Sequence, residues 1–174
     1  MAIAIFGGGC FWCIDAAFRK VKGVSEVISG YCGGEMSAPT YQQICTGLTG
    51  HAEVVKIEFD EHIVSYSNLL EFFFALHDPT QLNRQGNDVG TQYRSVIFYQ
   101  DDVQKLAALK YIAELQHHFE QPIVTELAPN AAFYSAEHYH QDYYQANPTQ
   151  PYCSMLIAPK LQKFYQRYCD YLTD

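Results

Sequence analysis

Runs of apolar residues along the chain predict several short strands. Residues 2–6, AIAIF, form an apolar run of strand length that ends at three glycines, which is typical of a buried strand. Val55, Ile57 and Phe59 alternate with polar residues, so one face of a strand there would be apolar. The predicted strands cover residues 2–6, 24–32, 51–60, 93–100 and 123–128.

Other segments carry apolar residues at helical spacing. Phe11, Ile14 and Phe18 would lie on one face of a helix, and Ser65 or Ser67 could cap the helix that follows the third strand. The predicted helices cover residues 11–20, 66–77, 101–119 and 159–172.

The order of the first six elements, β-α-β-β-α-β, predicts a fold class. It is the order of a split βαβ unit, so we expect an α+β protein with a ferredoxin-like two-layer sandwich core. Residues 130–157 show no clear period and are rich in tyrosine, so we expect a long irregular segment before the last helix. Without a linker or repeat, residues 1–174 are interpreted as one catalytic domain. The polar loop 78–92 is long for a compact domain, which indicates a functional role.

Composition narrows the class of protein. The 174 residues are 48% hydrophobic and 17% charged, as in soluble globular proteins. A net charge of −8 disfavours a phosphate-tracking surface, and no apolar run reaches membrane-spanning length, so we expect neither a nucleic-acid nor a membrane partner. The chain begins without a basic leader. We therefore expect a cytoplasmic monomer whose six cysteines are reduced.

The motif GGGCFWC at residues 7–13 carries the strongest chemical signal. Cys10 follows the glycines at the expected start of a helix, where unpaired N–H groups and the helix dipole favour a thiolate. Phe11 and Trp12 could line an apolar pocket beside its sulfur. Cys13 stands three residues later, close enough to form a disulfide with Cys10.

Three other readings of this motif are open from the residues alone. The thiols could be inert and buried, as free cysteines often are. A thiol–disulfide oxidoreductase could use Cys10 and Cys13, although Phe-Trp between them is bulky for that role. A zinc-stabilised binding module would need further ligands, for which the available residues are Cys32, Cys45, His138 and His140.

Several long motifs, in order along nearly the whole chain, resemble one family. GGGCFWC, PTYQQICTGLTGHAEVVKIEFD, HDPTQLNRQGNDVGTQYRSVIFY and VTELAPNAAFYSAEHYHQDYY, with the later PYC, are similar to peptide-methionine (S)-S-oxide reductases, the A-type methionine sulfoxide reductases. The resemblance implies a metal-free enzyme without a cofactor. It would repair oxidised proteins by reducing methionine S-sulfoxide, protein-bound or free, with thioredoxin as the external reductant.

The resemblance also implies roles for individual residues. Cys10 would attack the sulfoxide sulfur, and Phe11 and Trp12 would receive the S-methyl group. Glu53 would protonate or hydrogen-bond the sulfoxide oxygen. It shares strand parity with Val55 and Ile57, which favours burial and hence a raised carboxyl pKa. The same family match assigns the remaining assisting groups: the phenols of Tyr41 and Tyr93 and the carboxylate of Asp88.

The sequence does not decide which cysteine is the resolving one, the thiol that forms a disulfide with Cys10. The sulfenic acid left on Cys10 would condense with a second thiol. Cys13 is nearest to Cys10 in sequence. Cys153 lies where many family members carry a resolving cysteine, in a segment whose prolines suggest a mobile arm. Cys169 or direct reduction of the sulfenic acid are further options. Asp15 stands where the family usually has Glu. The histidines at 51, 138 and 140 are expected to be hydrogen-bonded structural or rim histidines rather than bases.

Overall fold

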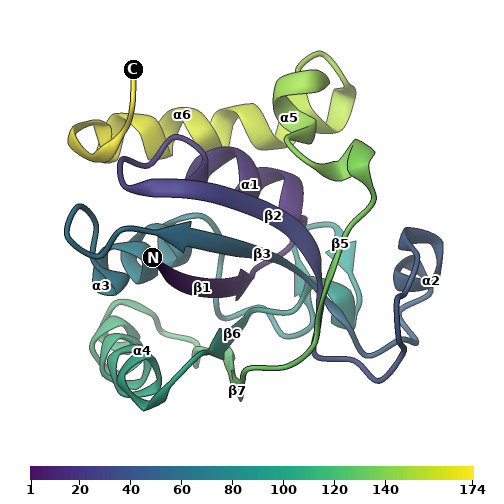
Figure 1. Ribbon diagram of the computed structural model, residues 1–174, viewed down its shortest axis with the longest axis horizontal. Helices are drawn as coiled ribbons and strands as arrows, with labels where there is room; N and C mark the ends of the chain where they lie inside the picture. The colour runs from purple at the N-terminus through teal and green to yellow at the C-terminus, as the bar shows by residue number, and fades with distance from the viewer.

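A six-stranded sheet runs through the centre of the computed structural model, which describes residues 1–174 (Figure 1). The strand order is β7-β6-β1-β3-β2-β8. All neighbouring strands are antiparallel except β6 and β7, which are parallel. The strands are β1 (Ala2–Gly7), β2 (Val24–Cys32), β3 (Ala52–Phe59), β6 (Val96–Tyr99), β7 (Glu126–Pro129) and β8 (Phe133–Ser135).

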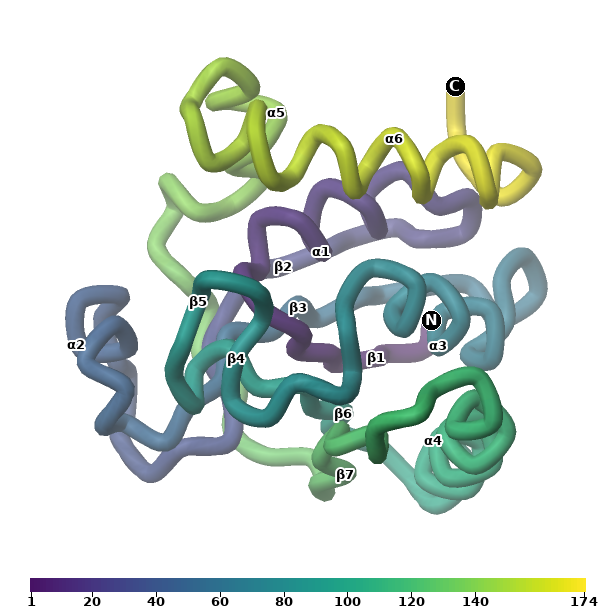
Figure 2. Tube along the Cα trace, turned by 180° about the vertical axis from the view of Figure 1, so that it is seen from behind, coloured from purple at the N-terminus to yellow at the C-terminus, as the bar shows by residue number.

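Six helices surround this sheet. They are α1 (Phe11–Phe18), α2 (Tyr41–Cys45), α3 (Tyr66–Ala75), α4 (Asp102–Leu115), α5 (Tyr143–Ala146) and α6 (Ala158–Arg167). Helix α6 runs alongside α1 in both views (Figures 1 and 2), and α5 also packs against α1. Ser65 rather than Ser67 caps α3, in a capping box with Asn68. The α+β class expected from the sequence is confirmed.

The alternation of side chains along the strands divides the apolar residues between the two faces of the sheet. Phe6 and Val55 face the main core, which the helices complete with residues such as Phe18, Phe73 and Phe164. The opposite face carries a smaller apolar cluster: Ile5, Cys32, Ala52, Val54, Val96 and Phe98. Because Glu53 has the parity of Val55, its carboxyl group points to the helix-covered face.

The structure adds elements that the sequence did not predict. Helix α2 lies in what was expected to be a loop, and the polar loop 78–92 contains a hairpin of β4 (Arg84–Gln85) and β5 (Asp88–Val89). Strand β8 adds an edge strand from the segment expected to be irregular. A π-helical turn, Cys153–Ile157, leads directly into α6, so the expectation of a mobile arm around Cys153 is wrong for this structure.

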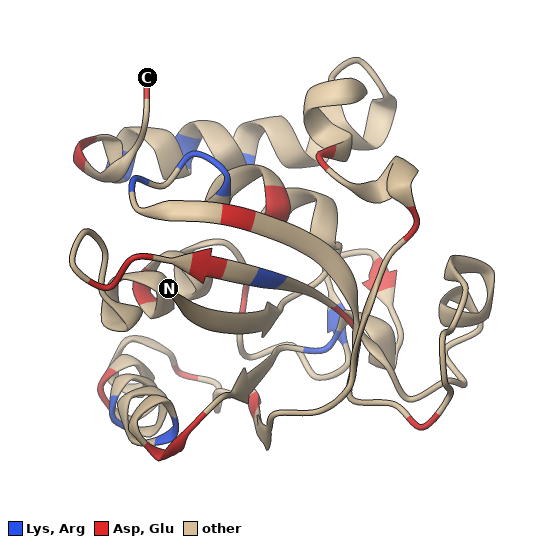
Figure 3. Ribbon diagram, in the orientation of Figure 1, with Lys and Arg blue, Asp and Glu red and all other residues tan.

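Charged side chains are spread over the molecule. Figure 3 shows Lys and Arg on α6, on α4 and in the connection between α1 and β2, and Asp and Glu on several other elements. None of the helices is both long and apolar enough to cross a membrane.

Candidate active site

Cys10 stands at the junction of β1 and α1. Gly9 has a φ of 91°, a left-handed conformation that glycine adopts without strain, and this turn directs the chain from the strand into the helix. Cys10 is the N-cap residue of α1, and its side chain makes no capping hydrogen bond. The sulfur is therefore available to a neighbouring cavity of about 240 Å³, whose lining includes Cys10, Cys13, Asp88, Tyr152, Ile157 and Lys160. We call it the Cys10 cavity.

Glu53 lies next to Cys10 inside the protein. Its side chain is 2% exposed, and Oε1 accepts a hydrogen bond from the backbone N–H of Phe11 at 3.3 Å. Burial raises the pKa of Glu53 to about 8, against the smaller lowering effect of that hydrogen bond, and the Asp88 charge raises it further. The expected burial and raised pKa are both confirmed, so Glu53 carries a proton at neutral pH.

The Cys10 thiol does not have the low pKa that its place at a helix start suggested. Burial raises its pKa well above the usual value, the Glu53 charge adds to this, and the Trp12 N–H only partly offsets it. The expectation of a lowered pKa is therefore wrong for the site without substrate. Loss of water around the sulfur outweighs the N–H groups at the helix start, so the thiolate requires another group to take its proton.

Tyr41 and Tyr93 bring two phenols toward the same carboxyl group. Tyr41 begins α2 and Tyr93 ends the 3₁₀ turn Thr91–Tyr93. Burial raises the pKa of both, followed in each case by the charge of Glu53. Both hydroxyls therefore stay protonated at neutral pH and can donate hydrogen bonds without adding charge.

Asp88 enters the site from the β4–β5 hairpin. It lines the Cys10 cavity, and its Oδ2 accepts a hydrogen bond from the Tyr152 hydroxyl. Tyr152 was not singled out by the sequence analysis, because nothing distinguishes it there from the thirteen other tyrosines. Only its place in the PYC motif, one residue before Cys153, gave a signal.

Phe11 and Trp12 differ in exposure. Phe11 is fully buried, with its ring 5.8 Å from that of Tyr31. Trp12 is half-buried and stacks on Tyr143, with ring centres 3.8 Å apart and planes within 10°. Its Nε1–H donates to Nδ1 of His140 at 3.0 Å. His140 thus has the structural role expected of it.

The six cysteines are all free. Cys13 lies in the first turn of α1 and lines the Cys10 cavity. Burial raises its pKa to about 11, although the ammonium group of Lys160 acts in the opposite direction. Cys153 is fully buried and does not line the cavity. No group of three or more His, Cys, Asp or Glu side chains is placed to hold a metal ion, so the zinc-module reading finds no ligand cluster.

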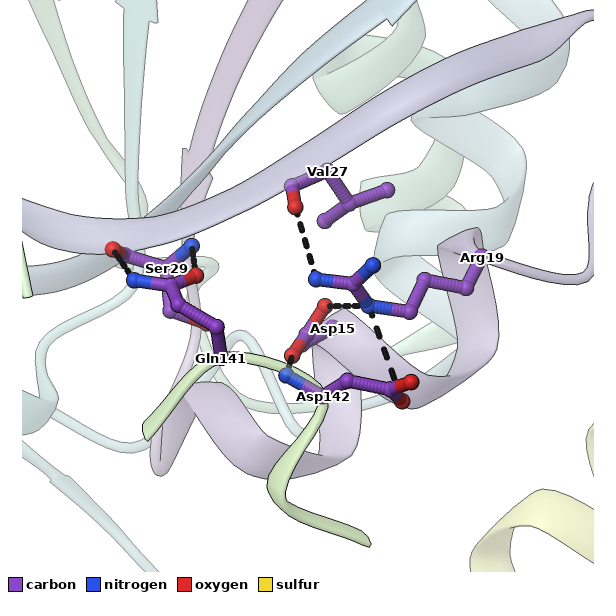
Figure 4. A network of polar contacts seen from close by, with 6 residues as sticks. All are labelled: Asp15, Arg19, Val27, Ser29, Gln141 and Asp142. Atoms are coloured by element: carbon purple, nitrogen blue, oxygen red, sulfur yellow. Dashed lines mark hydrogen bonds and ion pairs between the residues drawn. The ribbon is translucent and has the colours of Figure 1, made fainter. Parts of the chain in front are cut away.

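Asp15 anchors the segment that carries Tyr143. Its buried carboxylate pairs with Nε of Arg19 at 2.5 Å and accepts from the backbone N–H of Asp142 at 2.8 Å (Figure 4). In the same view Gln141 bonds to both backbone groups of Ser29. These contacts fix residues 141–142 against α1 and β2, and so place Tyr143 on Trp12.

A thiol beside a protonated carboxyl group, in an α+β fold, is typical of an enzyme that attacks an electrophile and protonates its oxygen. Comparison with known proteins identifies the family to which the chain belongs. The family model "Peptide methionine sulfoxide reductase" matches residues 2–171, and the chain belongs to this family.

Relatives and solved structures agree with this assignment. The chain is 60% identical over 164 residues to a peptide methionine sulfoxide reductase MsrA of Nautilia profundicola, covering 94% of each chain. It is 56% identical to an MsrA of Acinetobacter baumannii, covering 100% of this chain and 99% of the relative. Mxr1 from Saccharomyces cerevisiae in reduced form superposes with a TM-score of 0.82 at 34% identity, covering 86% of this chain and 87% of Mxr1. Mxr1 has also been solved in complex with Trx2.

Proposed function

We propose that this protein reduces methionine S-sulfoxide, in peptides and as the free amino acid, to methionine. The observation that carries the proposal is the pair formed by Cys10 and the buried, protonated Glu53. A sulfoxide oxygen leaves only when it is protonated, so the reaction needs a sulfur nucleophile and an acid on either side of one S–O group. Family membership over residues 2–171 supports the same substrate.

The proposal assigns a residue to the attack on sulfur and to the protonation of oxygen. Cys10 attacks the sulfoxide sulfur as a thiolate, and Glu53 gives its proton to the sulfoxide oxygen. The oxygen ends on Cys10 as a sulfenic acid and methionine is released, so Cys10 loses two electrons and the sulfoxide sulfur gains them. Tyr41 and Tyr93 donate hydrogen bonds to the oxygen, and Asp88 helps to bind substrate.

Trp12 forms the wall that receives the S-methyl group. Its indole is fixed by Tyr143 on one face and by the hydrogen bond to His140, which makes a rigid apolar surface beside Cys10. Phe11 lies buried against Tyr31 and extends this surface inward.

Cys13 is the resolving thiol in this proposal. It lines the same cavity as Cys10, and Lys160 faces that cavity too, so a positive charge supports the Cys13 thiolate. Its attack on the sulfenic acid forms a Cys10–Cys13 disulfide and releases water. Cys153 would first have to leave its buried position in the π-helical turn.

Thioredoxin is the proposed reductant of that disulfide, as the complex solved for Mxr1 suggests. The proposal treats the chain as one catalytic domain that needs no cofactor and acts as a monomer. Six free cysteines favour a reducing compartment such as the cytoplasm. We also describe the core as ferredoxin-like, because the order β6-β1-β3-β2 with antiparallel neighbours follows the split βαβ scheme.

A coupled assay tests this function. Methionine S-sulfoxide should oxidise reduced thioredoxin in the presence of the protein, whereas the R epimer should not, and Cys10→Ser should be inactive. Turnover of a disulfide substrate without turnover of the S-sulfoxide would overturn the proposal in favour of a thiol–disulfide oxidoreductase.

A further inference from the structure

Lys160 is the only positively charged side chain that lines the Cys10 cavity. It lies in the first turn of α6 and is exposed to solvent. The same cavity holds the sulfur of Cys10, so a cation lies beside the place where the sulfoxide would react. The proposed function uses this cation only to support the Cys13 thiolate and gives it no part in substrate binding.

No carboxylate in the cavity neutralises this cation. The ion pairs within the protein are made by Arg19 and Arg94, and none includes Lys160. Asp88, the one acid that lines the cavity, accepts a hydrogen bond from Tyr152 instead. Because a lysine ammonium is a point charge on a flexible stem, Lys160 is free to bind an anion that enters the cavity.

A second hollow beside Lys160 offers the amine no partner either. Asp78 lies there, but its carboxylate accepts the N–H and the O–H of Thr80 and makes no ion pair with the amine. Within the Cys10 cavity, burial raises the pKa of the Cys13 thiol and the ammonium group partly opposes this, as expected for a charge that faces the cavity.

The substrate can bring a carboxylate within reach of this cation. In free methionine sulfoxide, two methylene groups separate the sulfur from the carbon that bears the α-carboxylate. With the sulfur at Cys10, that carboxylate lies a short side chain away, in a cavity of about 240 Å³. Within a peptide the α-carboxylate is consumed in an amide bond, and the side chain of a neighbouring acidic residue would supply the same group.

We propose that Lys160 is a specificity-determining residue that binds a carboxylate of the substrate while the sulfoxide lies at Cys10. This inference rests on the proposed function and names the substrates that it favours: methionine sulfoxide with a free α-carboxylate or with an acidic neighbour. Lys160 acts on binding, and the chemistry at sulfur remains with Cys10 and Glu53. Since the amine is exposed, the ion pair should be modest in strength and sensitive to salt.

The test compares Lys160→Met with Lys163→Met. Methionine keeps an apolar stem and removes the charge. Lys163 lies one turn further along α6, is also exposed, and does not line the cavity. Formation of the reduced product is followed in one turnover without reductant, so that the resolving step does not enter the rate.

Two pairs of substrates distinguish the two sources of the carboxylate. N-acetyl-methionine S-sulfoxide and its amide differ only in the α-carboxylate. Peptides in which the S-sulfoxide is followed by Glu or by Gln, with both ends blocked, differ only in a side-chain carboxylate.

The unaltered protein should reach its half-maximal rate at a roughly 5-fold lower concentration of the charged member of a pair, as a partly exposed ion pair allows. Lys160→Met should remove this preference, and Lys163→Met should keep it. Added salt should weaken the preference in the unaltered protein. A response confined to the first pair assigns the α-carboxylate, and one confined to the second assigns the acidic neighbour. A preference that is absent from the unaltered protein, or that persists in Lys160→Met, would overturn the proposal.

An alkylation measurement without sulfoxide separates this proposal from the proposed function. Iodoacetate carries a carboxylate and iodoacetamide does not, and mass spectrometry measures how fast each modifies Cys10. The ratio of the iodoacetate rate to the iodoacetamide rate should fall several-fold in Lys160→Met and stay unchanged in Lys163→Met. An equal ratio in all three proteins would contradict the carboxylate site. If no sulfoxide were reduced, the proposed function would fail, while this ratio would still decide whether Lys160 attracts carboxylates to Cys10.

Discussion

The indole of Trp12 donates a hydrogen bond to Nδ1 of His140, with the two nitrogens 3.0 Å apart. His140 is fully buried, and burial lowers its pKa, so the ring is neutral and Nδ1 is free to accept. This bond joins the first helix to the 3₁₀ turn His138–His140. It therefore fixes the orientation of the one tryptophan in the protein, which stands next to Cys10.

Replacing His140 with Phe should weaken substrate binding more than it slows the chemical step. The indole N–H would lose its acceptor, at a cost of about 1–3 kcal/mol in the free energy of unfolding, and the ring would be less restrained. We expect KM to rise several-fold with a smaller change in kcat. His138→Phe is the control, since His138 is exposed and on the same turn. Equal effects from both variants would show that the Trp12 contact is not responsible.

Glu53 should make the protein less stable as pH rises. Its pKa is about 8 in the folded protein against a usual 4.5, so the folded state holds a proton that the unfolded state loses. Its stabilising effect is complete below pH 4.5 and is lost as pH rises through 8, by roughly 1.4 kcal/mol per pH unit at most.

Glu53→Gln, which cannot ionise, tests this dependence. Urea unfolding at pH 5, 6.5 and 8 should show a free energy that falls with pH in the unaltered protein and a flatter profile in the variant. The same substitution should slow turnover on the order of 10²-fold or more, because the acid is lost. Parallel unfolding profiles for the two proteins would contradict the buried, protonated state of Glu53.

Arg19→Met should destabilise the protein in a pH-dependent way. The Asp15 carboxylate would remain buried without its partner, and we expect a loss of about 2–3 kcal/mol at pH 7.5. Burial already raises the Asp15 pKa to about 6 despite Arg19, so the loss should shrink as pH falls and Asp15 takes up a proton. Lys110→Met, which removes an exposed positive charge, should show no such trend in urea unfolding.

Disulfide mapping should distinguish the two resolving candidates. After one turnover without reductant, we expect a Cys10–Cys13 link in the unaltered protein and in Cys153→Ser. Cys13→Ser should instead accumulate a sulfenic acid on Cys10. A Cys10–Cys153 link would show that the buried π-helical turn opens during the cycle, and would exclude Cys13 as the principal partner.

Local patterns in the sequence were sufficient to predict part of this site. The parity of Glu53 with Val55 and Ile57 predicted its burial, because side-chain direction alternates strictly along a strand. The glycines before Cys10 likewise predicted a cysteine at a helix start.

Tertiary features of the site could not be predicted from such patterns. The contact of Tyr152 with Asp88 joins residues 64 positions apart, and no local periodicity encodes it. The Cys10 pKa depends on how much water the folded protein excludes, and the prolines near Cys153 suggested mobility where tertiary packing produces a helical turn.

The central claim is that Cys10 takes the oxygen from methionine S-sulfoxide. The most direct measurement uses a Cys13→Ser, Cys153→Ser double variant, given the S-sulfoxide and the sulfenic-acid reagent dimedone without reductant. The account predicts one methionine released per chain and a dimedone adduct on the peptide containing Cys10. Methionine release without an adduct on Cys10, or undiminished turnover in Cys10→Ser, would contradict it.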